Sequence, residues 1–315
     1  MRRTQAFFIL TLALVMTSIN LHDAAAPGVL AQSDPVIAAA GDIACDPANP
    51  DYQQGNGTPN ACRMGATADI VVARRPTAVL ILGDNQYEDG ALAKYQVSYE
   101  GSWGRFKTIT HPSVGNHEYG TRGAAGYFAY FGAAAGDPAK GYYSFDLGAW
   151  HLIALNSNCR FAGGCGPGSP QERWLREDLA ANGRRACVLG FWHHPRFSSG
   201  PHGSDETMDA LFRVLYDAGA DVALSGHDHD YERFAPLNGD GQPDPTRGVR
   251  QFIAGTGGRS HYPFVRLHFS SEVRNADTFG VLMLTLHPTS YDWEFVPERG
   301  KTFTDRGSTA CSPVR

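Results

Sequence analysis

The stretch VIAAAGD at residues 36–42 and the similar stretch AVLILGD at residues 78–84 decide the fold of this chain. Each is a short apolar run that ends in Gly-Asp, and residues 64–74 between them have the apolar spacing of a helix. Two short buried strands joined through a helix favour parallel pairing in one sheet. The two aspartates then follow the carboxyl ends of neighbouring strands, where open α/β sheets bind their ligands.

The same alternation continues along the chain. Helical patterns occur at 91–108, 124–131, 170–182 and 205–218, and strand-like runs at 142–146, 150–156, 186–192 and 221–225. The last third is rich in β patterns: QFIAG (251–255), VRLHF (265–269), FGVLMLTL (279–286) and YDWEFV (291–296). This order predicts an α/β fold in which two sheets pack face to face with helices outside.

Composition narrows the class of protein. The chain has 315 residues, 42% hydrophobic positions and a formal net charge of −5. These values exclude a disordered tail or a collagen-like fibre, and the acidic balance argues against a protein that binds nucleic-acid backbones. No linker divides the part after the leader, so residues 35–315 are expected to form a single domain.

The first thirty-one residues have the layout of a secretory signal peptide. Arg2 and Arg3 precede an apolar run at residues 6–16, and small residues follow at 24–26 and at Ala31. We expect residues 1–31 to be a signal peptide cleaved after Ala26 or Ala31, with an uncleaved anchor as the alternative. The mature protein is then secreted or periplasmic and has no membrane span, because no other apolar run reaches the required length.

Six cysteines form an even set, which an oxidising compartment allows to pair. Closeness in sequence favours Cys45 with Cys62 and Cys159 with Cys165. Cys187 and Cys311 would then join an internal strand to the C-terminal region. Metal thiolates are the alternative, but no CxxC pair occurs.

Five apolar runs end in residues of the kind that bind metals. The segments are GD (41–42), GDNQY (83–87), GNHE (115–118), FWHHP (191–195) and GHDH (226–229). Each segment alone has an ordinary structural explanation, such as a turn, a helix cap or a core histidine. Burying all of these polar groups without a cation would cost several kcal/mol each. The five segments together therefore predict one shared metal centre.

In type and order these segments resemble the motif blocks GD, GDxx, GNH(E/D), H and GHxH of the calcineurin-like metallophosphoesterase superfamily. The resemblance extends from Asp42 to about Gly258 and implies a four-layer αββα sandwich of two mixed sheets with flanking helices. Most members have a histidine in the first block, where this chain has Ala44. Tyr87, three residues after Asp84, instead resembles the purple acid phosphatase branch, in which a tyrosine phenolate binds ferric iron.

The resemblance implies two metal ions that share one carboxylate. The first would be bound by Asp42, Asp84, Tyr87 and His229, and the second by Asp84, Asn116, His193 and His227. Hard, oxygen-rich ligands suit Fe(III), and the site with two imidazoles suits a divalent Zn, Fe or Mn ion. We therefore expect Fe(III) together with one of these divalent ions.

The resemblance further implies an acid-phosphatase-like enzyme that hydrolyses small phosphate monoesters with a hydroxide activated by the metals. His202, nine residues after His193, and His117 are the candidates to contact phosphate or to protonate the leaving group, and Glu118 would orient a neighbouring histidine. An exposed loop histidine is the alternative for His202. Two other functions stay open: a phosphodiesterase acting on nucleotides or lipid head groups, and a metal- or phosphate-binding protein without turnover.

Overall fold

The computed structural model describes residues 33–182 and 187–312, so the signal-peptide prediction lies outside the described residues. The described residues from Asp34 onward belong to one compact unit. Its helices are α1 (Met64–Arg74), α2 (Leu92–Lys94), α3 (Ala125–Phe131), α4 (Pro170–Asn182) and α5 (Asp209–Ala218). Among the described residues, no helix has both the length and the apolar character needed to cross a bilayer.

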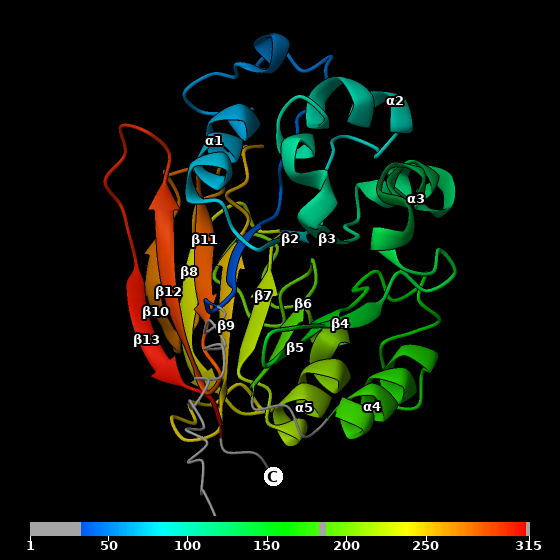
Figure 1. The fold of residues 1–315 in the computed structure, drawn as a ribbon, viewed down its shortest axis with the longest axis vertical. Coiled ribbons are helices and arrows are strands. Elements are labelled where there is room, and N and C mark those ends of the chain that lie inside the picture. Colours follow the sequence, from blue (N-terminus) through cyan, green and yellow to red (C-terminus); the bar gives the residue numbers. More distant parts are fainter. Residues whose placement is uncertain (1–32, 183–186, 313–315) are drawn as a thin grey trace, which may run out of the picture. The chain divides into compact units, whose positions relative to one another are not determined.

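Two mixed sheets form the centre of this unit (Figure 1). The six-stranded sheet has the order β13 (Arg306–Ala310), β12 (Ser290–Pro297), β11 (Gly280–Leu286), β1 (Val36–Ala40), β2 (Ala78–Leu82) and β3 (Thr110–Ser113). Strands β1, β2 and β3 are parallel, whereas β11 runs antiparallel to β1. The parallel pairing predicted for residues 36–42 and 78–84 is therefore correct.

The seven-stranded sheet is also mixed. Its order is β10 (Ser271–Asn275), β8 (Tyr231–Leu237), β9 (Val249–Ala254), β7 (Val222–Ser225), β6 (Cys187–Phe191), β5 (Trp150–Ala154) and β4 (Tyr143–Leu147). Strands β5, β6, β7 and β9 are parallel to one another. At one edge β4 pairs antiparallel with β5, and at the other β8 pairs antiparallel with both β9 and β10.

Three apolar clusters bind four layers together. One packs α1 and α3 against the outer face of the six-stranded sheet. The second lies between the sheets and includes Leu80 of β2 and Leu189 of β6. The third packs α4 and α5 against the outer face of the seven-stranded sheet (Figure 1). Neighbouring strand residues face opposite layers, as Leu80 and Ile81 do, so both faces of central strands such as β2 are buried. The αββα sandwich is thereby confirmed.

Two predicted elements differ from the structure. Residues 91–108 are not one helix but α2, the π-turn η2 (Tyr95–Tyr99) and the 3₁₀ helix η3 (Trp103–Ile109). The helical geometry is interrupted at Gly101 and Ser102, where Ser102 has the non-helical angles φ −109° and ψ −92°. Residues 265–269 form no strand, because the backbone N–H groups of Val265, Arg266 and His268 bond to Ser199 of a neighbouring loop instead of a strand partner.

Three disulfides cross-link the unit, and all six cysteines are paired. Cys45–Cys62 joins the loop after β1 to the start of α1, and Cys159–Cys165 closes a loop between β5 and α4. Cys187–Cys311 ties β6 to the segment after β13. The first two are the pairings that closeness in sequence favours, and the third joins the two cysteines that then remain.

His151 predicts a pH-dependent part of the stability. Its ring is 2% exposed, with Nδ1 2.9 Å from Asp146 and Nε2 2.7 Å from Asp178. Burial alone would lower the pKa of His151, but hydrogen bonds and charge from Asp178 and Asp146 raise it above the ordinary value. The protonated histidine therefore stabilises the fold fully below its unfolded-state pKa, and this contribution is lost as pH rises through the raised folded-state pKa.

We expect His151→Asn to lower the free energy of unfolding by about 2 kcal/mol near pH 5 and by clearly less near pH 9. Denaturant unfolding at the two pH values measures the difference. The control is His287→Asn, which removes a more exposed histidine between Asp34 and Asp292 and should have a smaller effect. An equal loss at both pH values for His151→Asn would contradict the ion-pair assignment.

Candidate metal centre

The residues predicted as metal ligands lie in loops that follow parallel strands. Asp42 follows β1, Asp84 follows β2, Asn116 follows β3, His193 follows β6 and His227 follows β7. Three of them have left-handed backbone angles that side chains rarely adopt, with φ of 59° at Asp42, 45° at Asp84 and 73° at His227. Such angles cost of order 1–3 kcal/mol each and cluster at functional sites.

Tyr87 lies at the centre of the first half of this cluster. Its Oη atom is 2.8 Å from Asp42 Oδ1, 3.1 Å from Asp84 Oδ2 and 3.0 Å from His229 Nε2. All four side chains are buried. The single hydroxyl hydrogen of Tyr87 can be donated to only one of these three acceptors. Burial together with the Asp42 and Asp84 carboxylates raises the pKa of Tyr87 well above its ordinary value. A cation among these atoms would remove the repulsion and favour the phenolate.

His193 lies at the centre of the second half. Its Nδ1 donates to the carbonyl of Leu82 at 2.9 Å, which fixes Nδ1 as a protonated nitrogen. Nε2 then points at Asn116 Oδ1 (2.9 Å), Asp84 Oδ2 (3.2 Å) and His227 Nδ1 (3.1 Å). Burial lowers the pKa of His193, but the Asp84 carboxylate outweighs burial and raises it to about 9. The Asp84 charge thus favours a positive charge at the place where four donor atoms converge.

Asp84 connects the two halves. Its Oδ2 atom lies 3.1 Å from Tyr87 Oη and 3.2 Å from His193 Nε2, while Oδ1 accepts from the backbone N–H of His117 at 3.0 Å. Two triads of this cluster bring their donor atoms within 4.8 Å of one another: Asp42, Asp84 and His193, and His193, His194 and His227. Carboxylate, phenol and imidazole groups in this arrangement fit a pair of metal ions that share Asp84.

The two histidines predicted to act on substrate lie at the border of this cluster. The His117 ring is 4.3 Å from the Tyr87 ring, and its Nδ1 donates to the Glu88 carbonyl at 2.6 Å. The His202 ring is 4.1 Å from the His227 ring, and its side chain is 42% exposed. Both imidazoles therefore keep Nε2 available beside the metal ligands.

Asp228 is a residue of the site that sequence reasoning missed. It is fully buried between the two histidines of GHDH, and its Oδ1 lies 2.8 Å from His202 Nδ1. Its hydrogen bond raises the pKa of His202, and the backbone N–H of His202 donates to the same oxygen at 3.1 Å. The position of Asp228 between the predicted ligands His227 and His229 could have indicated a role in the site. Its contact with His202 on a distant loop could not be predicted from the sequence.

Glu118 corrects the expectation that it orients a histidine. Its carboxylate accepts instead from the backbone N–H groups of Asn85 (2.9 Å), Gln86 (3.2 Å) and Gly115 (2.8 Å). The loops after β2 and β3 fold around the buried Glu118 side chain, and this brings these amides, and not a histidine ring, to its carboxylate. Burial and the nearby Asp84 charge raise the pKa of Glu118 to about 7. Glu118 thus joins the two loops that present Asp84 and Asn116.

The loop after β9 supplies further residues that sequence reasoning missed. The Tyr262 ring stacks on the His229 ring at 3.9 Å, and the Ser260 hydroxyl lies 2.9 Å from His229 Nδ1. The Arg259 guanidinium lies 5.1 Å over the Tyr87 ring and pairs with Glu88 at 2.8 Å. Nothing in the spacing of residues 255–262 indicated these contacts.

Gly115 gives a test of the geometry. A Cβ atom at this position would lie 2.1 Å from Asp84 Oδ1 and 2.2 Å from the Asp84 backbone nitrogen, so Asp84 and the Gly115 loop would be pushed apart. We expect Gly115→Ala to lower metal affinity about 10- to 100-fold, because the shared carboxylate is moved. Competition with a coloured chelator measures this affinity. Gly101→Ala is the matched control, since its Cβ would meet nothing within 4 Å; equal affinity in both variants would contradict the placement of Asp84.

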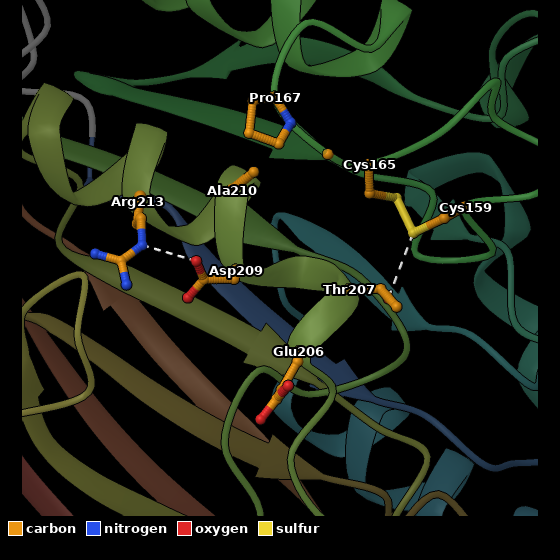
Figure 2. A pocket seen from close by; sticks show the side chains of 9 residues that line it. Cys159, Cys165, Pro167, Glu206, Thr207, Asp209, Ala210 and Arg213 are labelled. Atoms are coloured by element: carbon orange, nitrogen blue, oxygen red, sulfur yellow. Dashed lines mark hydrogen bonds and ion pairs between the residues drawn. A yellow bond between two sulfur atoms is a disulfide. The ribbon is translucent and has the colours of Figure 1, made fainter.

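A separate cavity of about 650 Å³ contains none of the predicted ligands or catalytic histidines. Figure 2 shows its lining, in which the Cys159–Cys165 disulfide faces the start of α5. Two of its three charged side chains form ion pairs within the protein: Arg213 Nε lies 2.7 Å from Asp209 Oδ2, and Arg213 Nη1 lies 2.7 Å from Asp240.

Comparison with known proteins identifies the family of this fold and cluster. The sequence model of the calcineurin-like phosphoesterase family matches residues 36–231. The chain belongs to the calcineurin-like phosphoesterase family. Purple acid phosphatase 15 of Arabidopsis thaliana is 26% identical over 203 residues, which cover 53% of this phosphoesterase and 37% of that protein. Purple acid phosphatase 22 of the same plant is 38% identical over 98 residues, covering 30% and 22% of the two chains.

Solved structures support the fold of this phosphoesterase. Purple acid phosphatase PPD1 from yellow lupin superposes with a TM-score of 0.69 at 19% identity, covering 89% of this chain and 55% of that one. A PhoD structure superposes with a TM-score of 0.58 at 12% identity, covering 89% and 70%. At these identities the likeness establishes the shared fold. The phosphoesterase spans less than two thirds of the length of the curated purple acid phosphatases above.

Proposed function

We propose that this phosphoesterase is a secreted dinuclear metalloenzyme that hydrolyses small phosphate monoesters, as an acid phosphatase does. The observation that carries the proposal is Asp84 Oδ2, which lies 3.1 Å from Tyr87 Oη and 3.2 Å from His193 Nε2. This carboxylate belongs to both halves of the cluster. The proposed ligands are the seven named from the sequence: Asp42, Asp84, Tyr87, Asn116, His193, His227 and His229.

The donor set supports Fe(III) in one half and a divalent Zn, Fe or Mn ion in the other. Asp42, Asp84 and Tyr87 offer hard, anionic oxygens, whereas His193 and His227 offer two imidazoles and Asn116 a neutral amide. When bound, a metal pair lowers the pKa of water and neutralises charge on the phosphoryl oxygens.

The residues around the ligands position the substrate and the proton. Asp228 holds Nδ1 of His202, so Nε2 is the nitrogen that faces outward to donate a proton to the leaving oxygen. His117 is held through Nδ1 by the Glu88 carbonyl, so its Nε2 is likewise directed away from that bond, 3.9 Å from Asp84 Oδ2. We propose both histidines as the groups that contact phosphate or the leaving group.

The cellular setting is part of the same proposal. Three disulfides are characteristic of chains that fold in an oxidising compartment. Together with the signal peptide predicted at residues 1–31, they support the proposal that one catalytic domain at residues 35–315 is secreted or exported to the periplasm.

Steady-state kinetics on two soluble esters test the function. We expect kcat/KM for p-nitrophenyl phosphate to exceed that for bis(p-nitrophenyl) phosphate by about tenfold or more, because the dianionic monoester is attracted more strongly to a cationic centre. A preference for the bis-ester would support the phosphodiesterase alternative. Metal-loaded protein that turns over neither ester would contradict the proposal.

A further inference from the structure

A row of exposed apolar side chains lies on the segment after the metal-type cluster. Val265, Leu267 and Phe269, which we call the apolar row, are 63%, 60% and 66% exposed. They are more exposed than any other large hydrophobic side chain among the described residues, where the next is Val97 at 57%. Three large apolar side chains exposed within five residues are a candidate interaction site.

The backbone of this segment is fixed, so the exposure of the row does not come from a frayed loop. The N–H groups of Val265 and Arg266 donate to the Ser199 carbonyl at 3.0 and 3.3 Å, and the N–H of His268 donates to Ser199 Oγ at 2.8 Å. The His268 ring packs inward against Phe197 at 5.3 Å. The Phe269 ring stacks on the His268 ring at 4.7 Å and still remains 66% exposed, so the apolar row lies at the surface of a segment that is anchored through its backbone and the His268 ring.

The segment is continuous with the proposed active centre. It begins at Tyr262, whose ring stacks on His229 at 3.9 Å and lies 5.4 Å from the His202 ring. Its anchor, Ser199, lies three residues before His202 on the same loop. The apolar row therefore begins on the side of the cluster where the proposed proton donor to the leaving group lies.

We propose that the apolar row inserts into the surface of a lipid aggregate whose headgroups carry the phosphate monoester substrate. This inference rests on the proposed function and names its substrate class: amphiphilic phosphate monoesters presented at a lipid–water interface. High exposure of all three side chains suits insertion into an apolar layer, and the exposed Arg266 between them supplies a cation for anionic headgroups. In the reaction a water oxygen bonds to phosphorus, the P–O ester bond breaks, and the lipid alcohol leaves with a proton as phosphate is released.

The test compares vesicle-bound and soluble substrates. Vesicles of phosphatidylcholine mixed with phosphatidic acid serve for cosedimentation and for phosphate release, and p-nitrophenyl phosphate serves as the soluble ester. We expect Leu267→Ser/Phe269→Ser to reduce vesicle binding and phosphate release from phosphatidic acid about tenfold per side chain, while kcat/KM on p-nitrophenyl phosphate stays unchanged. Val72→Ser/Val97→Ser is the control, because it removes two exposed apolar side chains from α1 and η2 and should change neither measurement.

The outcomes separate this inference from the proposed function. A wild-type enzyme that hydrolyses p-nitrophenyl phosphate but neither binds these vesicles nor releases phosphate from them overturns the inference alone. A metal-loaded wild type without activity on any ester overturns the proposed function. Sedimentation velocity on both double variants adds a third outcome: a dimer that only the Leu267→Ser/Phe269→Ser variant loses would show that a second copy covers the row, and would overturn insertion into lipid.

Discussion

Asp84→Ala is expected to reduce kcat on p-nitrophenyl phosphate about a thousandfold or more. Oδ2 of Asp84 is the oxygen that contacts both Tyr87 and His193, so its removal separates the two halves of the proposed centre. A metal pair contributes several kcal/mol to stabilising phosphoryl-transfer charge, and three decades in rate correspond to about 4 kcal/mol. The Oδ1 contact with the His117 backbone is lost as well, so the histidine proposed to contact substrate would also shift.

The matched control for Asp84→Ala is Asp69→Asn. Asp69 is a surface carboxylate with a 72% exposed side chain that pairs with Arg105 at 2.8 Å. This variant should keep the wild-type kcat and metal content. Far-ultraviolet circular dichroism of Asp84→Ala should match the wild type, because the strands on both sides of the loop are buried independently of the carboxylate. A folded Asp84→Ala protein with activity within tenfold of wild type would contradict a shared bridging carboxylate.

Tyr87→Phe is expected to abolish the broad visible absorption of the iron-loaded protein. Tyr87 Oη is the phenol atom within 3.1 Å of Asp42, Asp84 and His229, and a phenolate bound to ferric iron gives such a band. Phenylalanine keeps the ring that packs against His117 and removes only the ligand atom. We expect a second effect on activity of about 10- to 100-fold, because the ion held by Asp42 and His229 is retained more weakly.

Tyr262→Phe controls for a general effect of losing a tyrosine hydroxyl. The Tyr262 ring stacks on His229, but Asp42 and Asp84 bond to Tyr87 instead. This variant should therefore keep its colour. Wild-type protein that binds iron and stays colourless, or Tyr87→Phe protein that keeps the band, would contradict the tyrosinate assignment.

The sequence predicts the parts of this structure that depend on local pattern. Residues 36–40 and 78–82 are apolar throughout, so they form parallel strands buried on both faces, and the aspartates that follow are presented at one sheet edge. The limits of α1 and α4 match the predicted ranges 64–74 and 170–182, because apolar residues recur there at helical spacing without an interruption. Residues 91–108 have similar spacing, but Gly101 and Ser102 end the helical geometry inside the range.

The rest depends on contacts between distant segments. Asp228 binds His202 twenty-six residues away, and Glu118 binds amides of Asn85 and Gln86 more than thirty residues away. Neither partner is visible from spacing. The segment VRLHF has the alternation of a strand, yet its amides bond to Ser199 and leave its apolar side chains exposed. Local alternation specifies which residues share a face, but it does not say whether a strand or a loop lies beside them.

Metal analysis of the natively purified protein, combined with activity in the same fractions, tests the central claim most directly. The account predicts two metal ions per chain, one of them iron, and p-nitrophenyl phosphate hydrolysis that rises and falls with the metal content on chelation and reloading. Full hydrolysis by protein that holds one metal ion or none would contradict it.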